Sequence, residues 1–236
     1  MVDTFIEIDI TEDHVYRHSG LSATLLGSFA SPGGAPVGLD LDENDNLLSS
    51  DFGVGHNFRH SGVSATLLGS VAGQGSLRGL GYDNNNNLLT ADANNEFIYT
   101  FDGFSTTITG SFLGQGGARG LVVDSNNDLY QSDDSNNEIW HFSGISNTVL
   151  GSVNAIGGDV FGVVFDTEGN LLSCSQTNSF IYIHDGFSNN LLGSFATGAS
   201  DPLGTTCLLG EVPEVGGIVI FKLNDAFTSI CYPGTV

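Results

Sequence analysis

The sequence predicts an all-β protein, a β-propeller built from four-stranded antiparallel blades. Three observations support this prediction: a long repeat of nearly constant period, four short strand-like segments within each repeat, and turn-forming residues between the segments. A phrase that runs from His18 to Ser28 recurs four more times along the chain. Its anchoring glycines are spaced by 42, 41, 41 and 42 residues, at Gly20, Gly62, Gly103, Gly144 and Gly186.

One repeat shows the predicted strands in order. Residues 120–124 form a short apolar run, which is typical of a buried inner strand. The turn that follows is rich in asparagine, which tolerates a positive φ and bonds to its own backbone. Residues 129–133, 139–142 and 148–153 give the next three strands, with turns at 136–137 and 143–144 between them. Each repeat is therefore predicted to be one blade.

The same repeat resembles the NHL family of propeller repeats. The match consists of GLVVD at 120–124, Leu129-Tyr130, Asp133, Asn136-Asn137 and Ile139. Residues 79–98 match about as well, residues 162–181 match more loosely, and the resemblance extends over nearly all of residues 1–209. This chain departs from the family pattern at Glu138, where the family has a basic residue, and in the first turn, where asparagine mostly replaces glycine. The resemblance implies the propeller fold and identifies no partner.

The number of blades follows from the two ends of the chain. Inner strands begin at Gly38, Gly79, Gly120 and Gly162, and a fifth, at 204–209, lacks the turn that follows the others. Residues 4–9 align with second strands but have no inner strand before them. We therefore expect the ends to share one blade, with residues 1–30 as its outer three strands and 203–209 as its innermost. This gives five blades within a domain of residues 1–209. In the alternative, the tail completes a degenerate sixth blade.

The remaining residues, 210–236, are predicted to be a C-terminal tail. Residues 211–217 suggest a linker, and residues 217–223 and 227–232 suggest a hairpin. The hairpin is apolar, and an exposed apolar strand can pair with another chain. We expect the tail to mediate a homo-oligomer or a larger assembly through Ile218, Ile220, Phe221, Phe227 and Tyr232.

Composition restricts the partners. The chain carries 27 acidic residues against five basic ones, a formal net charge of −22. Such a surface repels phosphate backbones and anionic lipids, so nucleic-acid and membrane partners are not expected. The first ten residues lack the basic region of a signal peptide, and no segment is long enough to span a membrane. We expect a soluble protein of the cytoplasm or a virion. The three cysteines are expected to be small buried residues.

The repeat also creates two rings of aspartates. One follows the inner strand, at Asp42, Asp83, Asp124 and Asp166. The other ends the second strand, at Asp9, Asp51, Asp92 and Asp133, with Ser175 in the remaining blade. Carboxylates in turns suit Ca²⁺, but they also cap turns by accepting backbone hydrogen bonds. Turn capping is the favoured interpretation for both rings. Ca²⁺ binding by Asp9, Asp51, Asp92 and Asp133 is the alternative, and no other cofactor is expected.

Arg78 and Arg119 give the best indication of a binding site. Both stand directly before an inner-strand glycine, where the other blades have Val37, Phe161 and Leu203. A guanidinium at this position could bind a carboxylate or an acidic glycan through two hydrogen bonds. The strand-end aspartates Asp51, Asp92 and Asp133 are further candidates for ligand binding. The favoured interpretation of the two arginines is nevertheless structural, an ion pair with the neighbouring ring of aspartates.

The function predicted from these features is non-enzymatic binding or scaffolding. Equivalent histidines in different blades are too far apart to form a catalytic triad, and no catalytic residue is predicted. Near-identical blades favour repeated recognition of a protein or glycan, and the acidic, lysine-poor composition is typical of a virion or surface assembly in a saline setting. Two alternatives remain: a Ca²⁺-dependent hydrolase or lactonase with one axial metal, and a lectin with one sugar pocket per blade.

Overall fold

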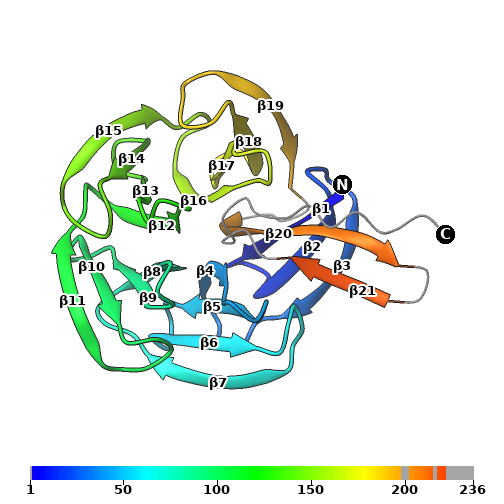
Figure 1. Ribbon diagram of the computed structural model, residues 1–236, viewed down its shortest axis with the longest axis horizontal. Coiled ribbons are helices and arrows are strands. Elements are labelled where there is room, and N and C mark those ends of the chain that lie inside the picture. The colour runs from blue at the N-terminus through cyan, green and yellow to red at the C-terminus, as the bar shows by residue number, and fades with distance from the viewer. Residues whose placement is uncertain (1, 198–201, 215–216, 222–236) are drawn as a thin grey trace.

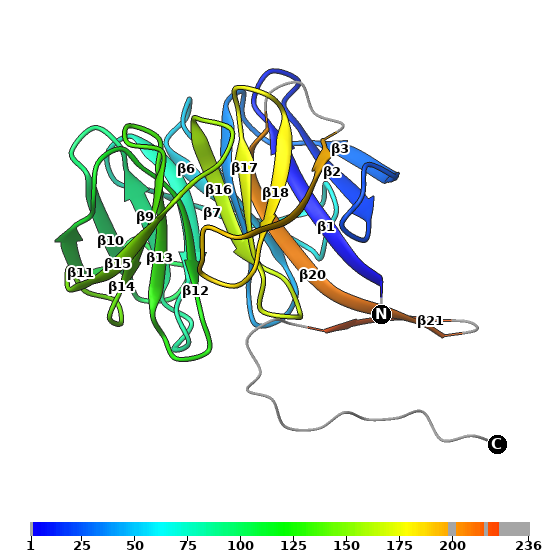
Figure 2. The same cartoon turned by 90° about the horizontal axis from the view of Figure 1, so that it is seen from above.

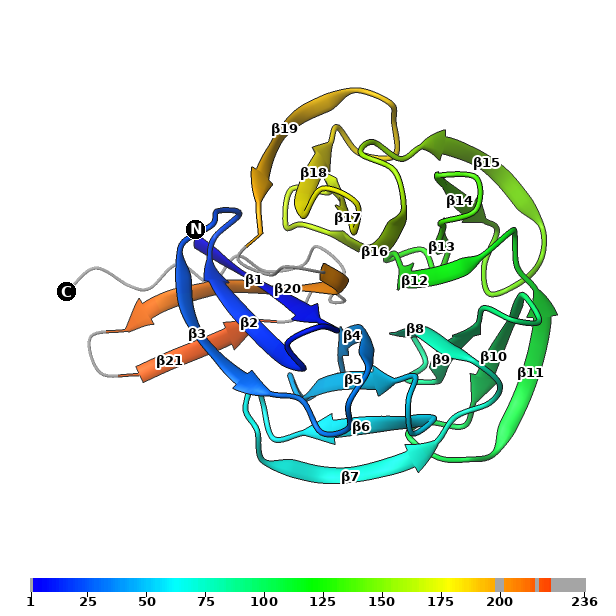
Figure 3. The same cartoon turned by 180° about the vertical axis from the view of Figure 1, so that it is seen from behind.

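A computed structural model describes residues 2–197, 202–214 and 217–221, with side chains for 4–197 and for Pro202. Five separate antiparallel sheets surround a central axis (Figure 1, and Figure 3 from behind). The prediction of a five-bladed propeller is confirmed, and the six-blade alternative is wrong. The described part of the chain contains no helix of the length and apolarity needed to cross a bilayer.

Four blades are continuous in sequence, and each runs from an inner strand to an outer one. The first is β4 (Pro36–Leu41), β5 (Leu47–Asp51), β6 (His56–His60) and β7 (Leu67–Ala72). The second is β8 (Leu77–Tyr82), β9 (Leu88–Asp92), β10 (Phe97–Phe101) and β11 (Ile108–Leu113). The third is β12 (Ala118–Val123), β13 (Leu129–Asp133), β14 (Glu138–Phe142) and β15 (Val149–Asn154). The fourth is β16 (Val160–Phe165), β17 (Leu171–Ser175), β18 (Phe180–His184) and β19 (Leu191–Ala196).

The fifth blade joins the two ends of the chain, as predicted. Its outer strands are β1 (Val2–Asp9), β2 (His14–Ser19) and β3 (Leu25–Ala30), and its innermost strand is β20 (Pro202–Glu214). β20 pairs with β1 in antiparallel register, for example Cys207 with Phe5. This pairing closes the ring with backbone hydrogen bonds and removes two free sheet edges.

The tail differs from the prediction. β20 continues through Glu214, so the first four residues of the expected linker at 211–217 are strand. It pairs there with β21 (Gly217–Phe221), which contains the assembly candidates Ile218, Ile220 and Phe221. Figures 1 and 2 show the end of β20 and β21 extending past the body of the propeller. The expected partner strand at 227–232, with Phe227 and Tyr232, lies outside the described residues.

The hydrophobic core is divided into five clusters. Each cluster fills the wedge between two neighbouring blades, as where Leu48 of β5 packs with Leu80, Leu88 and Phe101 of the next blade. The second strands β5, β9, β13 and β17 are buried along their whole length, whereas the outer strands are mostly exposed. The fold is therefore stabilised by burial between blades, and no blade can bury its apolar faces alone.

The inner strands approach one another most closely at the glycine that follows the arginine position. A Cβ atom built on Gly79 would lie 1.7 Å from the Arg119 carbonyl oxygen of the next inner strand. The corresponding distances are 2.7 Å from Gly38 to the Arg78 oxygen and 2.3 Å from Gly120 to the Phe161 oxygen. Glycine is required at this position because five blades close around a very narrow axis.

Candidate axial binding site

Arg78 and Arg119 stand where the inner strands are irregular. The pairing register shifts between Leu77 and Leu80 in β8, and between Ala118 and Leu121 in β12. Each arginine thus belongs to a β-bulge, a feature that redirects a side chain out of the regular alternation. β8 and β12 are neighbouring inner strands, so both guanidiniums lie at the same end of the axis. Burial lowers the pKa of Arg78, the nearby positive charge of Arg119 lowers it further, and the carboxylate of Asp134 acts in the opposite direction.

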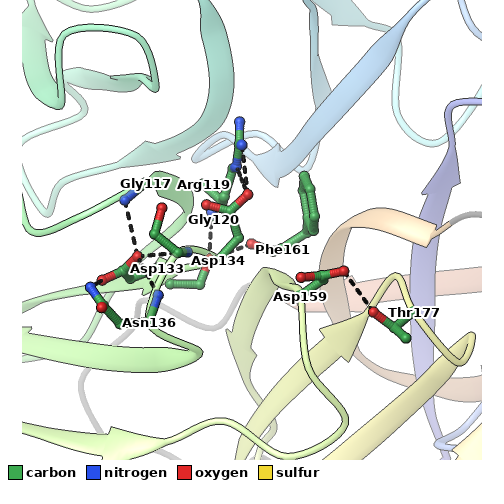
Figure 4. Close-up of polar contacts among 11 residues, drawn as sticks. Gly117, Arg119, Gly120, Asp133, Asp134, Asn136, Asp159, Phe161 and Thr177 are labelled. Atoms are coloured by element: carbon green, nitrogen blue, oxygen red, sulfur yellow. Dashed lines mark hydrogen bonds and ion pairs between the residues drawn. The ribbon is translucent and has the colours of Figure 1, made fainter.

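The two arginines have different partners. Arg119 donates from Nε to Asp134 Oδ2 at 2.7 Å, and one terminal nitrogen lies 2.6 Å from the same oxygen (Figure 4). Arg78 instead has its Cζ atom 4.0 Å from the centre of the Phe52 ring. Within the described residues no carboxylate forms an ion pair with Arg78, and its buried Nε has no hydrogen-bond acceptor. Neither arginine therefore forms the ion pair with the strand-end aspartate ring that the sequence suggested: Arg119 pairs with Asp134, the residue after that ring, and Arg78 forms no ion pair within the described residues.

The cause of this difference is one position that varies between blades. The residue after each strand-end aspartate or serine is different in every blade: Ile10, Phe52, Ala93, Asp134 and Gln176. Asp134 supplies the carboxylate for Arg119, whereas Arg78 has Ala93 at the equivalent place. Sequence reasoning missed Asp134 and Phe52 because it concentrated on positions that repeat. A position that varies among nearly identical blades, such as the one after the strand-end aspartate, could have identified these two residues.

The strand-end aspartates cap loops by accepting hydrogen bonds from backbone N–H groups, and Asp133 shows this pattern most fully. Its Oδ1 accepts hydrogen bonds from the backbone N–H of Gly117 at 3.0 Å, Ser135 at 2.9 Å and Asn136 at 3.2 Å. Its Oδ2 accepts from Asn136 Nδ2 at 2.7 Å (Figure 4). The same oxygen accepts from the indole of Trp140 at 3.3 Å. One buried carboxylate thus fastens the loop after its own strand to the loop that enters the inner strand.

The other members of this ring have the same role. Asp51 accepts from the backbone of Ala35 and Val54, and Asp9 accepts from the backbone of Thr11 and Glu12. Asp92 accepts from Ser76, Asn94 and Asn95. Burial of Asp92 opposes its ionisation, but these hydrogen bonds outweigh burial and lower its pKa. Ser175 is a hydrogen-bond donor where the aspartates are acceptors, since its hydroxyl donates to the carbonyls of Gly157 and Gly158.

The second ring of aspartates caps the turns after the inner strands. Asp42 Oδ1 accepts from the backbone of Asn44 and Asn46, and Oδ2 accepts from the Asn46 amide. Asp83, Asp124 and Asp166 repeat these two backbone contacts. The residues with described placement include no group of three or more His, Cys, Asp or Glu side chains that could hold a metal ion. The geometry of both rings supports turn capping.

The equivalent histidines His18, His60 and His184 are buried in three different blades. His60 Nδ1 donates to the Ser64 carbonyl at 2.9 Å, so Nε2 of the neutral ring accepts from the Ser49 hydroxyl at 3.0 Å. His184 has the same arrangement with Ser188 and Ser173. His18 differs, because its Nε2 lies 2.9 Å from Oε1 of the buried Glu7. These contacts make the histidines parts of the core.

We expect the two neutral histidines to make the protein acid-sensitive. Burial lowers the pKa values of His60 and His184, although the carbonyl hydrogen bonds oppose this. The unfolded chain therefore takes up protons first as the pH falls below about 6.5, and the stabilisation present above that pH is lost as the pH approaches the folded pKa. Phenylalanine occupies the same position at Phe101 and Phe142. In the double variant His60→Phe/His184→Phe, the drop in Tm between about pH 7.5 and about pH 5 should shrink by about 2–4 °C. An unchanged drop would contradict this assignment.

Cys174 in the fourth blade occupies the position that Ser132 has in the third blade. Its Sγ accepts from the Gly162 backbone at 2.9 Å, where Ser132 Oγ accepts from Gly120 at 2.7 Å in the third. Burial raises the pKa of the Cys174 thiol to about 12, so it is no nucleophile at neutral pH. The expectation of a small buried residue is confirmed for Cys174; the Cys207 side chain and Cys231 lie outside the description.

Comparison with known proteins supports the fold alone. No family model matches the chain, and no curated protein matches it. Among solved structures, a chain of the nidogen/laminin complex superposes with a TM-score of 0.64 at 15% identity, covering 87% of this chain and 98% of that one. Glutaminyl cyclase from Myxococcus xanthus gives 0.60 at 14% identity, with 82% and 74% covered. A Bacteroides caccae protein of unknown function gives 0.55 at 10% identity, with 83% and 73% covered. A propeller is thus shared by proteins of binding and enzymatic types.

Proposed function

We propose that this protein is a non-enzymatic binding propeller that docks a protein partner along its outer rim. The observation that carries the proposal is a pair of exposed residues at the start of every outer strand, at least one of them aliphatic. We call these the rim pairs: Leu25-Leu26, Leu67-Leu68, Ile108-Thr109, Val149-Leu150 and Leu191-Leu192. Apart from Phe52 and Val54, all large exposed hydrophobic residues in the described chain lie on the outer strands. Leu68 and Leu192 are 55% and 59% exposed.

The rim also presents free backbone. β3, β7, β11, β15 and β19 are edge strands of their sheets and surround the disc (Figure 1). None contains a charged residue or a proline, although the chain has 27 acidic residues. Soluble proteins usually protect such edges with charge, proline or a covering segment. Five unprotected edges with aliphatic side chains therefore suit a partner that adds a strand or presents aliphatic residues.

Further support comes from what the repeated polar residues do. Both aspartate rings and the equivalent histidines are engaged in caps and core contacts, which leaves no group poised for acid–base or nucleophilic chemistry among them. The acidic, lysine-poor composition favours a large assembly such as a virion or a surface layer in a saline setting, built on an NHL-type repeat.

The rim can be tested with a variant that copies a natural one. Thr109 occupies the second rim position in β11, where its hydroxyl donates to the Thr100 carbonyl. The quadruple variant Leu26→Thr/Leu68→Thr/Leu150→Thr/Leu192→Thr should therefore fold. The probe is an extended peptide of alternating valine and lysine, whose charge complements the net charge of −22. Isothermal titration should show several peptides bound per propeller, and the variant should bind at least about tenfold more weakly.

A single bound peptide, or an unchanged affinity in the variant, would contradict rim docking. Binding of neutral oligosaccharides with one site per blade, undisturbed by the threonine substitutions, would instead support the lectin alternative.

A further inference from the structure

We infer that Arg78 forms a binding site for one carboxylate carried by an apolar group, such as the C-terminal carboxylate of a protein partner. This site is at the axis and is independent of the rim pairs. Its components are the guanidinium of Arg78, the ring of Phe52 beneath it and the neighbouring Arg119. The three residues come from three consecutive blades, so the site exists only where these blades pack side by side.

Arg78 is a cation without an ion-pair partner in the described structure. The chain contains only five basic residues, and two of them stand next to each other at the axis. Asp134 neutralises Arg119, but Arg78 has no carboxylate partner in the described structure, and its buried Nε has no acceptor. A buried donor without a partner is costly, and a charged one is costlier still. A carboxylate that binds in a bidentate manner would accept two parallel hydrogen bonds from the N–H groups of the Arg78 guanidinium.

Exposed apolar surface lies beside the Arg78 guanidinium. Phe52 is 42% exposed although it lies under Arg78, and Val54 in the same loop is 52% exposed. On the other side, the Arg119 Cζ atom lies 5.0 Å from the centre of the Phe161 ring. The two rings orient the guanidiniums, and the exposed Phe52 and Val54 leave apolar surface beside Arg78, whereas Phe161 is buried. A ligand with an apolar group next to its carboxylate would cover that surface.

The negative charge around this end of the axis disfavours highly charged anionic ligands. Asp133, Asp134 and Asp159 lie around the same end of the axis (Figure 4). The chain as a whole has a formal net charge of −22. A polyanion would be repelled by this field, whereas a single carboxylate would gain the local attraction of Arg78, whose charge no ion pair in the described structure neutralises. We therefore assign the site to a monocarboxylate in preference to a phosphate or an acidic polysaccharide.

The chain offers a matched pair of variants. Ala93→Asp introduces a carboxylate at the position equivalent to Asp134, in the same blade as Arg78. The new aspartate should form an ion pair with Arg78 and so block binding of the ligand. Arg78→Val copies Val37 at the equivalent place in the first blade. Arg59 serves as the control, because it already pairs with Asp42 at the opposite end of the blade. Neither Ala93→Asp nor Arg78→Val should unfold the propeller, since both copy residues that other blades accept.

The experiment uses arginine side-chain NMR, which is simple here because the protein has only four arginines. Titration of the full-length protein with benzoate should shift the Nε–H signals of Arg78 and Arg119 with a Kd of about 1 mM, and leave that of Arg59 in place. Ala93→Asp should weaken binding at least about tenfold, and Arg78→Val should abolish it. The rim variant should bind benzoate unchanged, so failure of one proposal is distinguishable from failure of the other.

Two results would overturn the inference. If benzoate leaves the Arg78 signal unmoved, or if Ala93→Asp binds it as well as the parent, Arg78 is not a carboxylate site. If inorganic phosphate or glucuronate binds more tightly than benzoate, the ligand belongs to another chemical class.

Discussion

Replacement of Gly79 by alanine is expected to destabilise the propeller by about 3 kcal/mol or more. The new Cβ atom would lie 1.7 Å from the Arg119 carbonyl oxygen, so the backbones of β8 and β12 would have to move apart. That movement cannot stay local, because every inner strand is held between two neighbours around the axis. The effect should appear as a large fall in the urea midpoint without a change in slope, measured by circular dichroism.

The matched control is Gly110→Ala in the outer strand β11. No atom lies within 4 Å of the position that a Cβ would occupy there, and Gly110 does not have a positive φ. The same added methyl group should therefore be neutral, or stabilising by about 0.5 kcal/mol through the lower entropy of the unfolded chain. If both variants lose stability equally, the tight packing of inner strands is not what makes Gly79 necessary.

The ring itself was predictable because the repeat carries redundant information. Gly120, Asp124 and Asp133 each recur or nearly recur in other blades, so a misjudged boundary in one repeat is corrected by the others. The predicted second strand at 129–133 matches β13, and the inner strand predicted at 120–124 begins two residues earlier and ends one residue earlier, as Ala118–Val123. Closure by the two ends was also predictable, since the first repeat lacked an inner strand and the last one supplied it.

The axial site was only half predictable. The sequence places Arg78 and Arg119 at equivalent positions, but pairing depends on which side chain faces each guanidinium across a bulge, and no local pattern encodes that geometry. The tail was mispredicted for a similar reason. Residues 211–214 contain a proline and two glutamates, which favour a linker, yet the backbone of β20 continues because β21 pairs with it. Pairing between strands overrode local propensity there.

Substitution of Asp133 by alanine is the second change expected to have a large effect, about 4 kcal/mol. The carboxylate accepts hydrogen bonds from three backbone N–H groups, the Asn136 amide and the Trp140 indole, and all five donors would lose their acceptor. Trp140 is the only tryptophan in the chain, so its fluorescence reports directly on this cap. Urea unfolding followed by tryptophan emission should show both a lower midpoint and an altered native spectrum.

Two further variants separate capping from charge. Asp102→Ala removes the same charge from an exposed position and should change stability by less than about 0.5 kcal/mol. Asp133→Asn keeps one acceptor oxygen for the three backbone donors and should recover roughly half of the loss. If Asp133→Ala proves as mild as Asp102→Ala, the strand-end aspartates do not hold the loops together. That result would favour the alternative that these aspartates bind Ca²⁺, in which case Ca²⁺ should raise the Tm of the parent protein. If Asp133→Ala is severe and Ca²⁺ leaves the Tm of the parent unchanged, these carboxylates serve the backbone, and recognition must use the arginines and the rim.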